Sequence, residues 1–172
     1  MLEKIIGKDI ILRKQRMSDA DDFWRVAQDK EIAKWTRIKH PFTKEQAREQ
    51  MRRSIQQWKE GINYRYVIEY QRNIVGWVGL SIEKRDNRAE LFYAVDRQYR
   101  GKGIASEASK LILQQGFKKL KLNKIYATFM PGNTASKRVM EKIGMKYECT
   151  LKQHIKKGSR YYDAIQYYIL RQ

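Results

Sequence analysis

The stretch Gln98-Tyr99-Arg100-Gly101-Lys102-Gly103-Ile104-Ala105 constrains the fold more than any other part of this sequence. It lies between a strand-like run, Ala89 to Val95, and a helix-like run, Ile104 to Leu120. Two glycines let the backbone turn tightly and direct successive N–H groups into one concavity. The next helix directs its free N–H groups and the positive end of its dipole to the same place, and Arg100 and Lys102 add cationic side chains. This arrangement predicts a binding site for a phosphate or pyrophosphate.

Two common phosphate-binding loops do not fit these residues. A Walker A loop needs a lysine and a Ser or Thr directly after its last glycine, and here Ile104 and Ala105 follow Gly103. A dinucleotide-binding loop needs a third glycine and an acidic residue at the end of the next strand. Ser106 replaces that glycine, and the strand-like run from Lys124 to Met130 ends without a carboxylate. The loop therefore belongs to another class.

This loop and three further motifs resemble those of one protein family. The run Gln98 to Gly103 resembles the acetyl-CoA-binding loop of the GNAT acetyltransferases, Arg/Gln-x-x-Gly-x-Gly/Ala between a strand and a long helix. Pro131 to Ser136 resembles the family's N-x-x-S element, and Lys142 to Met145 resembles its K-x-G-F turn, with methionine in place of the aromatic residue. Lys157 to Asp163 resembles the x-G-x-x-x-D hairpin of the RimJ/RimL-type branch, which acetylates N-terminal amines of ribosomal and other proteins. The resemblance is strong from Ala89 to Leu170 and weaker before it.

This resemblance implies the GNAT fold, an α/β (α+β) architecture with a mixed, mostly antiparallel sheet flanked by helices. Hydrophobic periodicity and turn residues predict the matching order β-α-α-β-β-β-α-β-α-β-β. The expected strands are Asp9 to Lys14, Tyr64 to Tyr70, Ile74 to Glu83, Ala89 to Val95, Ile125 to Met130, Lys146 to about Lys156 and Tyr161 to Leu170, and the expected helices are Ser18 to about Gln28, Lys44 to about Glu60, Ile104 to Leu120 and Thr134 to Ile143.

Length and composition predict one domain, 1–172, because the chain has an ordinary domain size and no Ser/Gly-rich linker. The one cysteine, Cys149, excludes an internal disulfide and indicates a reducing compartment. The first residues lack the apolar segment of a signal peptide, and no apolar run is long enough to span a bilayer. We therefore expect a cytoplasmic protein with no membrane contact.

The formal net charge is +18. A basic surface suits an acidic partner such as the ribosome, RNA or the phosphates of CoA. The alternative is a solvated surface rich in Lys, Arg and Glu, as in heat-adapted proteins. The basic residues are dispersed along the chain, so both interpretations stay open; a homodimer is expected from the branch alone.

The resemblance implies acetyl-CoA as co-substrate and no metal. The backbone of Tyr93, Ala94 and Val95 is expected to pair with the pantetheine arm. Asn133 and Ser136 are expected to face the cofactor from the other side of the gap, and Asn133 also has the character of a helix N-cap. The pyrophosphate is expected on the N–H groups of Arg100, Gly101, Lys102, Gly103, Ile104, Ala105 and Ser106.

The catalytic residues are less well defined by the motifs. Glu90 is the candidate general base, and the alternative is an ordinary solvated strand carboxylate. Many family members have a tyrosine seven residues after the asparagine as the acid for the departing thiolate, and here that position is Met140, which has no proton to donate. Ser136 or a bound water is the replacement. His154 is a further candidate because histidine titrates near neutrality, against a structural role as the alternative.

Trp35, His40 and Phe42 lie in or beside the loop between the first two expected helices and are the candidate acceptor-binding residues. An α-amine has a pKa of about 7.7–8.0 and a lysine amine about 10.4, so a site without a strong base suits the α-amine. The RimJ/RimL-type resemblance implies the same acceptor, and we expect acetyl transfer to a protein N-terminal amine. Two alternatives remain: a small-molecule amine such as a polyamine or antibiotic, and a non-catalytic module that binds acetyl-CoA or RNA.

Overall fold

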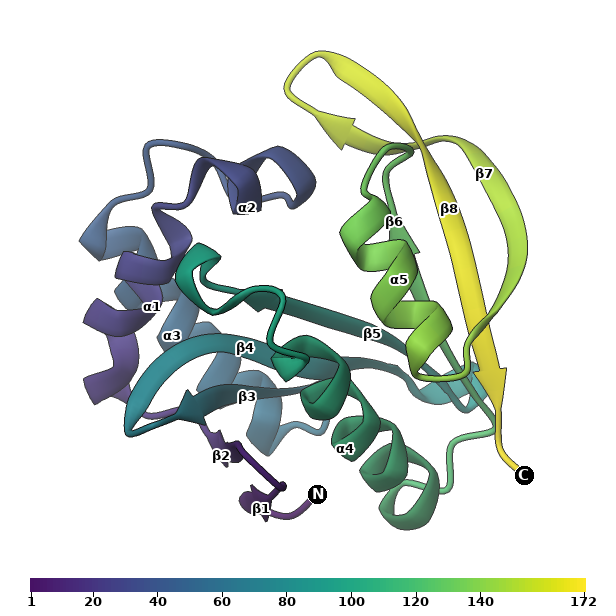
Figure 1. Ribbon diagram of the computed structural model, residues 1–172, viewed down its shortest axis with the longest axis horizontal. Coiled ribbons are helices and arrows are strands. Elements are labelled where there is room, and N and C mark those ends of the chain that lie inside the picture. The colour runs from purple at the N-terminus through teal and green to yellow at the C-terminus, as the bar shows by residue number, and fades with distance from the viewer.

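An eight-stranded mixed sheet forms the centre of the protein (Figure 1). The structure, a computed structural model, describes residues 1–172. The strands are β1 (Lys4–Ile6), β2 (Ile11–Lys14), β3 (Asn63–Tyr70), β4 (Asn73–Glu83), β5 (Arg88–Val95), β6 (Lys124–Phe129), β7 (Lys146–Lys157) and β8 (Arg160–Leu170). The helices are α1 (Ala20–Ala27), α2 (Lys30–Trp35), α3 (Lys44–Lys59), α4 (Ile104–Lys119) and α5 (Thr134–Lys142). The expected fold class is confirmed: the strand order is β1-β2-β3-β4-β5-β6-β8-β7, and β5–β6 is the one parallel pair.

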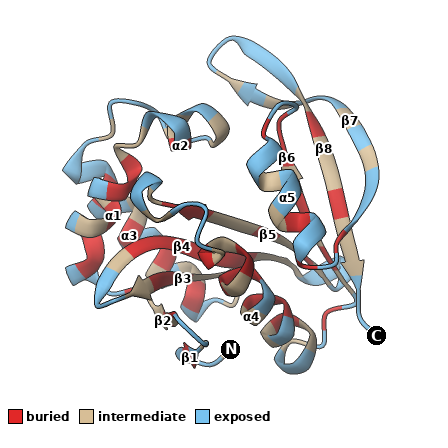
Figure 2. Ribbon diagram, viewed as in Figure 1, coloured by how far each residue is buried: buried red, intermediate tan, exposed pale blue.

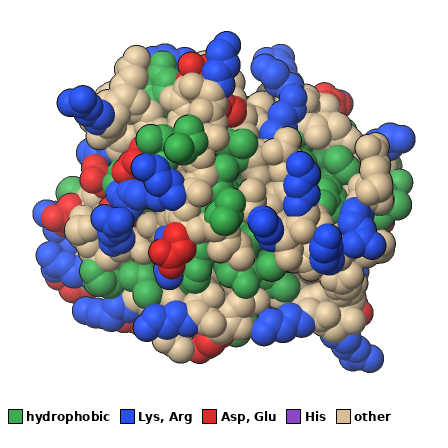
Figure 3. Space-filling view, turned by 90° about the horizontal axis from the view of Figure 1, so that it is seen from below, with side chains coloured by type: hydrophobic (Ala, Val, Ile, Leu, Met, Phe, Trp, Pro, Cys, Tyr) green, Lys and Arg blue, Asp and Glu red, His purple; other side chains and the backbone are tan.

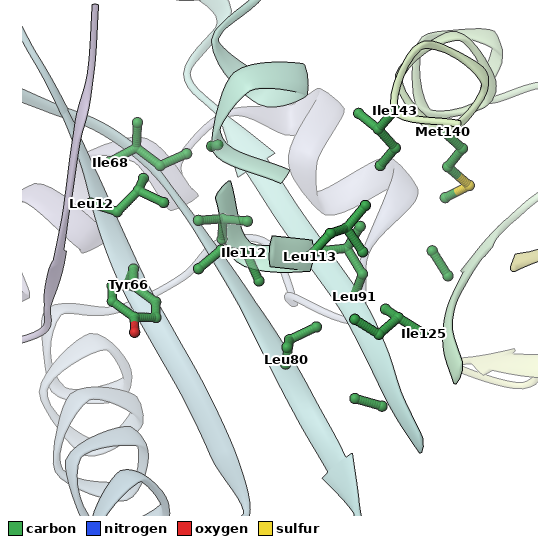
Figure 4. Packing of buried hydrophobic residues seen from close by; sticks show 14 of the residues in the cluster. Leu12, Tyr66, Ile68, Leu80, Leu91, Ile112, Leu113, Ile125, Met140 and Ile143 are labelled. Atoms are coloured by element: carbon green, nitrogen blue, oxygen red, sulfur yellow. The ribbon is translucent and has the colours of Figure 1, made fainter. Parts of the chain in front are cut away.

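The helices cover the sheet with two groups of buried side chains. The larger group joins α4 to the strands, and Figure 4 shows Ile112 and Leu113 of this helix beside Leu80, Leu91 and Ile125. The smaller group joins α1, α3 and the strands through residues such as Phe23, Met51 and Trp77. Figure 2 shows that the buried residues concentrate where the helices meet the strands. Both faces of the middle strands are therefore fixed by packing.

The two parallel strands separate along their length. β5 and β6 pair only at Arg88–Lys124, Ala89–Ile125 and Glu90–Tyr126. Beyond Glu90, the residues Leu91 to Val95 pair with β4 on one side and have no strand partner on the other. β6 continues beside β8 instead. This divergence, visible in Figure 1, leaves an open strand edge in the middle of the sheet.

Two short elements add to the expected order. β1 is three residues long and pairs with β2, and α2 has six residues. Both are too short to show a period in the sequence. The Asp29 carboxylate caps α2 by accepting a hydrogen bond from the N–H of Glu31 at 2.9 Å, which stabilises its first turn. The β3–β4 hairpin also turns more tightly than expected, at Gln71 and Arg72 alone, with φ of 50° and 65°.

Candidate active site

The loop before α4 has the backbone that its glycines predict. Gly101 and Gly103 both have φ of 79°, a conformation that other residues adopt at a cost. Gly103 is the N-cap of α4 and has no side chain to satisfy the first N–H groups of the helix. A Cβ added to either glycine would meet no atom within 4 Å. The glycines are thus needed for backbone conformation, and they leave accessible N–H groups that suit the phosphates of acetyl-CoA.

The cationic side chains of this loop lie differently from the expectation. The Nε of Arg100 donates to the carbonyl oxygen of Val95 at 3.0 Å, and its Nη2 forms an ion pair with Asp29. The Lys102 ammonium lies 5.3 Å from the ring centre of Tyr99. Arg100 therefore anchors the loop to the start of α2, because its guanidinium already has protein partners. The backbone N–H groups of the loop are thus the groups that its glycines leave free for a phosphate.

A cleft of about 620 Å³ runs from this loop along the free edge of β5 to α5. Its walls include the predicted cofactor residues apart from Lys102: Tyr93, Ala94, Val95, Arg100, Gly101, Gly103, Ile104, Ala105, Ser106, Asn133 and Ser136. The Asn133 side chain accepts a hydrogen bond from the Ser136 N–H at 3.1 Å, so it caps α5 as predicted while it lines the cleft. An extended, amide-bearing arm fits this cleft because the unpaired backbone of β5 offers it hydrogen bonds.

A second cavity of about 970 Å³ lies on the α1–α3 side of β5. Glu90, Tyr93 and Thr128 line both cavities, so the two meet where β5 and β6 separate. The Thr128 hydroxyl donates a 2.6 Å hydrogen bond to Glu90 Oε1. This carboxylate therefore stands, oriented, between the cofactor cleft and the second cavity, which we call the acceptor pocket.

Two hydroxyl groups lie on the cofactor side of this junction. Ser136 is half-buried at the first turn of α5. The Tyr93 hydroxyl reaches across from β5 and donates to the Ser136 carbonyl oxygen at 3.2 Å. Burial raises the pKa of Tyr93 to about 12, so its proton stays in place at neutral pH. Met140 lines the cleft with its apolar side chain.

The candidate acceptor residues divide into two groups. Trp35 and Phe42 line the acceptor pocket. The Phe42 carbonyl accepts hydrogen bonds from the side chains of Trp24 and Gln28, at 2.8 and 2.7 Å, and these bonds hold the loop in place. His40 is exposed and lines neither cavity.

His154 is also exposed, on β7, and the structure brings it to neither Ser136 nor Glu90, although its neighbour Ile155 lines the acceptor pocket. Thr128 and Arg65 are among the lining residues that the sequence motifs did not predict. The signal for Arg65 was a charged residue within an otherwise apolar strand pattern, Tyr64 to Ile68.

No group of three or more His, Cys, Asp and Glu side chains is arranged to hold a metal ion. None of the helices combines the length and apolarity needed to cross a membrane. On the face in Figure 3, Lys and Arg side chains are scattered among apolar and polar groups and do not form one basic patch.

Comparisons with known proteins give one family. A family model described as an acetyltransferase (GNAT) domain matches residues 9–146. The chain is 29% identical to an uncharacterized N-acetyltransferase p20 of Bacillus licheniformis, over 99% of this chain and 97% of that protein.

Two solved structures have the same fold. A GNAT-family acetyltransferase from Bacillus anthracis superposes with a TM-score of 0.87 at 30% identity and covers 97% of this chain and 98% of its own. RimL, a ribosomal L7/L12 alpha-N-protein acetyltransferase in complex with coenzyme A, superposes with a TM-score of 0.92 at 19% identity, with 98% of both chains covered. With the glycine loop, the split between β5 and β6 and the capped α5 in place, this chain belongs to the GNAT family of acetyl-CoA-dependent N-acetyltransferases.

Proposed function

We propose that this enzyme transfers the acetyl group of acetyl-CoA to the α-amine of a protein N-terminus. The observation that carries the proposal is the junction of the two cavities at Glu90. When bound, acetyl-CoA supplies the thioester carbonyl that an acceptor amine attacks. An amine entering from the acceptor pocket would meet both this carbonyl and a carboxylate at the same place, which is the arrangement that direct transfer requires.

Glu90 serves as the base that takes a proton from the amine. Thr128 holds the carboxylate by its 2.6 Å hydrogen bond and leaves the second oxygen, Oε2, for the acceptor. An α-amine needs little help, because its pKa of about 7.7–8.0 leaves part of it neutral at physiological pH. A single carboxylate is therefore a strong enough base for an α-amine. It is poorly suited to deprotonate the more basic amine of a lysine side chain.

Tyr93 serves as the proton donor on the cofactor side, in place of the residue that the family has at Met140. Its hydroxyl lies beside Ser136 and keeps its proton at neutral pH, because burial raises its pKa to about 12. A phenol is a stronger acid than the aliphatic hydroxyl of Ser136, which the sequence alone favoured for this role. Ser136 then contributes through its backbone carbonyl, which orients the phenol.

The volume of the acceptor pocket supports a peptide end as the acceptor. At about 970 Å³ and open to solvent, it has room for the first residues of a chain, with Trp35 and Phe42 as apolar walls. The fold shared with RimL is compatible with this assignment. At 19% identity the comparison supports the fold and does not transfer RimL's acceptor to this chain.

The test is turnover of acetyl-CoA, read as free CoA thiol, with three sets of acceptors: peptides that begin with Ala or Ser, the same peptides with blocked N-termini and an internal lysine, and polyamines. We expect turnover on the peptides with free N-termini, and at least tenfold less turnover on the blocked peptides and on the polyamines. Turnover confined to blocked, lysine-containing peptides or to polyamines would overturn it, and tight acetyl-CoA binding without turnover on any amine would point to a binding module.

A further inference from the structure

Arg65 of β3 is a charged residue without a protein partner. Its side chain lines the acceptor pocket, and no hydrogen bond or ion pair is made by its guanidinium. The Nε and Nη1 atoms are shielded from solvent and have no hydrogen-bond partner. A shielded cation without polar partners is uncommon in native proteins and costly. Nη2 is the guanidinium nitrogen that is not among the shielded atoms, so it is the atom through which a ligand in the pocket supplies a partner.

The fold holds this guanidinium in place through aromatic contacts. Its central carbon lies 5.1 Å from the ring centre of Phe92 and 5.9 Å from that of Phe23. Gly79 pairs with Arg65 on one side and Phe92 on the other, and a Cβ there would come within 2.6 Å of the Phe92 ring. The absent side chain of Gly79 therefore lets Arg65 and Phe92 meet across β4.

The cation remains charged under physiological conditions. Burial lowers the pKa of Arg65 to about 10, since desolvation disfavours the charged form, and this value is still well above neutral pH. The aromatic contacts offset part of the desolvation cost, because cations are attracted to the faces of aromatic rings.

The remaining charges of the pocket do not neutralise Arg65. Arg37, Lys39 and Arg53 line the same pocket and form no ion pairs. The lining carboxylates Glu45 and Glu49 pair with Arg48 and Arg52, which lie outside the pocket. Glu90 is the one lining carboxylate without a cation, so the pocket has an excess of positive charge facing a single base.

We propose that the acceptor carries an anionic group, a carboxylate or a phosphate, which binds to Arg65 while its amine faces Glu90. This inference rests on the proposed function, because it names the chemistry of the molecule that the same site acetylates. Glu90 and Phe92 lie on the same face of β5 two residues apart, about 7 Å along the strand. The guanidinium lies over Phe92. The distance between the amine site at Glu90 and the anion site at Arg65 therefore matches the length of a short acceptor molecule. A polycation would meet repulsion in this pocket.

The anion has two sources, an acidic side chain near the N-terminus of a peptide or the free acid group of a small amine. Matched acceptor pairs separate them: peptides beginning Ala-Asp or Ala-Asn, β-alanine or β-alaninamide, and phosphoethanolamine or ethanolamine. We expect the wild-type enzyme to prefer the anionic member of at least one pair by about 10- to 100-fold in kcat/KM, as charge-assisted hydrogen bonds in a shielded site do.

The variant Arg65→Met should remove this preference, chiefly by raising KM for the anionic member of each pair. Arg65→Lys keeps the charge and should retain part of the preference, which guards against a general loss of structure. Arg85→Met is the control, because Arg85 is exposed and lines neither cavity. Acetyl-CoA affinity should be the same in all variants.

Calorimetric titration of each matched pair into the CoA-bound enzyme reads the same preference without turnover. Equal affinity and equal kcat/KM for both members of every pair, or an anion preference that survives Arg65→Met, would overturn the inference while leaving acetyl transfer intact. Failure of the proposed function looks different: no amine is acetylated although acetyl-CoA binds, and the titration then decides whether Arg65 binds anions.

Discussion

The hydroxyl of Thr128 on β6 donates a 2.6 Å hydrogen bond to Glu90 on β5, at the point where the two parallel strands stop pairing. The last paired positions are Glu90 and Tyr126, so Thr128 is the first residue of its face after the strands diverge. The bond holds the carboxylate at the mouth of the acceptor pocket. The divergence of the two strands therefore brings Thr128 into position to orient the proposed base.

This contact predicts an ordered pair of losses in activity. Glu90→Gln should lower kcat by about 100-fold or more, because general bases contribute about 10²- to 10⁴-fold. Thr128→Val should cost about tenfold, since the carboxylate remains but is less well oriented. Steady-state kinetics at saturating acetyl-CoA measure both. A Glu90→Gln enzyme with kcat within threefold of wild type would remove Glu90 from the mechanism.

The glycine loop gives a prediction that separates binding from strain. Gly103→Ala should lower the free energy of unfolding by about 1–2 kcal/mol, the cost of a left-handed backbone for a residue with a Cβ. It should also weaken CoA binding at least tenfold, because Gly103 lines the cofactor cleft. Calorimetric titration with CoA and thermal unfolding measure the two effects.

Gly158→Ala is the matched control. Gly158 has φ of 61°, and a Cβ there also meets no atom within 4 Å, but it lies in the β7–β8 turn away from the cleft. The two variants should lose similar stability, and only Gly103→Ala should lose CoA affinity. Equal loss of affinity in both would mean that strain, not the loop, governs binding.

The predictable parts of the site are those that local sequence dictates. Gly101 and Gly103 need a positive φ, and Asn133 caps the helix that begins directly after it, so each was recognisable from its neighbours. Arg100 lines the cleft, and the motif gave no indication of its pairing with Asp29. Asp29 caps a six-residue helix, which has too few turns to give a periodic signal in the sequence.

The remaining parts depend on the order of strands in space. Thr128 and Glu90 are 38 residues apart in the sequence and meet because β6 lies next to β5. Arg65 comes from β3, two strands away from β5, and reaches Phe92 only because Gly79 lies between them. Long-range pairing of this kind leaves no pattern in a single sequence beyond one charged residue in an apolar strand.

Tyr93 leads to a test of the proton donor. Tyr93→Phe should lower kcat by about 100-fold, the lower bound for general acid–base catalysis, whereas Ser136→Ala should change it by less than about threefold. The pKa of Tyr93, raised by burial to about 12, predicts that the wild-type pH profile shows no loss from this group below pH 10. The reverse order of losses would return the role to Ser136.

Asp163 at the β7–β8 hairpin gives a stability prediction with a defined pH dependence. Its carboxylate accepts a 2.9 Å hydrogen bond from the N–H of Gln153, which sits in a bulge with φ of 49°, and pairs with Lys152 at 3.0 Å. The hydrogen bond and then the ammonium hold the pKa of Asp163 below its ordinary value of 3.8. A carboxylate whose pKa is lower in the folded state adds stability above its unfolded pKa and loses that contribution as pH falls through the folded value.

The Asp163→Asn variant should therefore melt at a lower temperature than wild type at pH 7. The difference in melting temperature should shrink to nothing as the pH is lowered past the folded pKa. Thermal unfolding at pH 7, 4 and 2.5 measures this, with Asp86→Asn as the exposed control. A difference in melting temperature that is constant across this range would show that Asp163 acts through its shape and not through its charge.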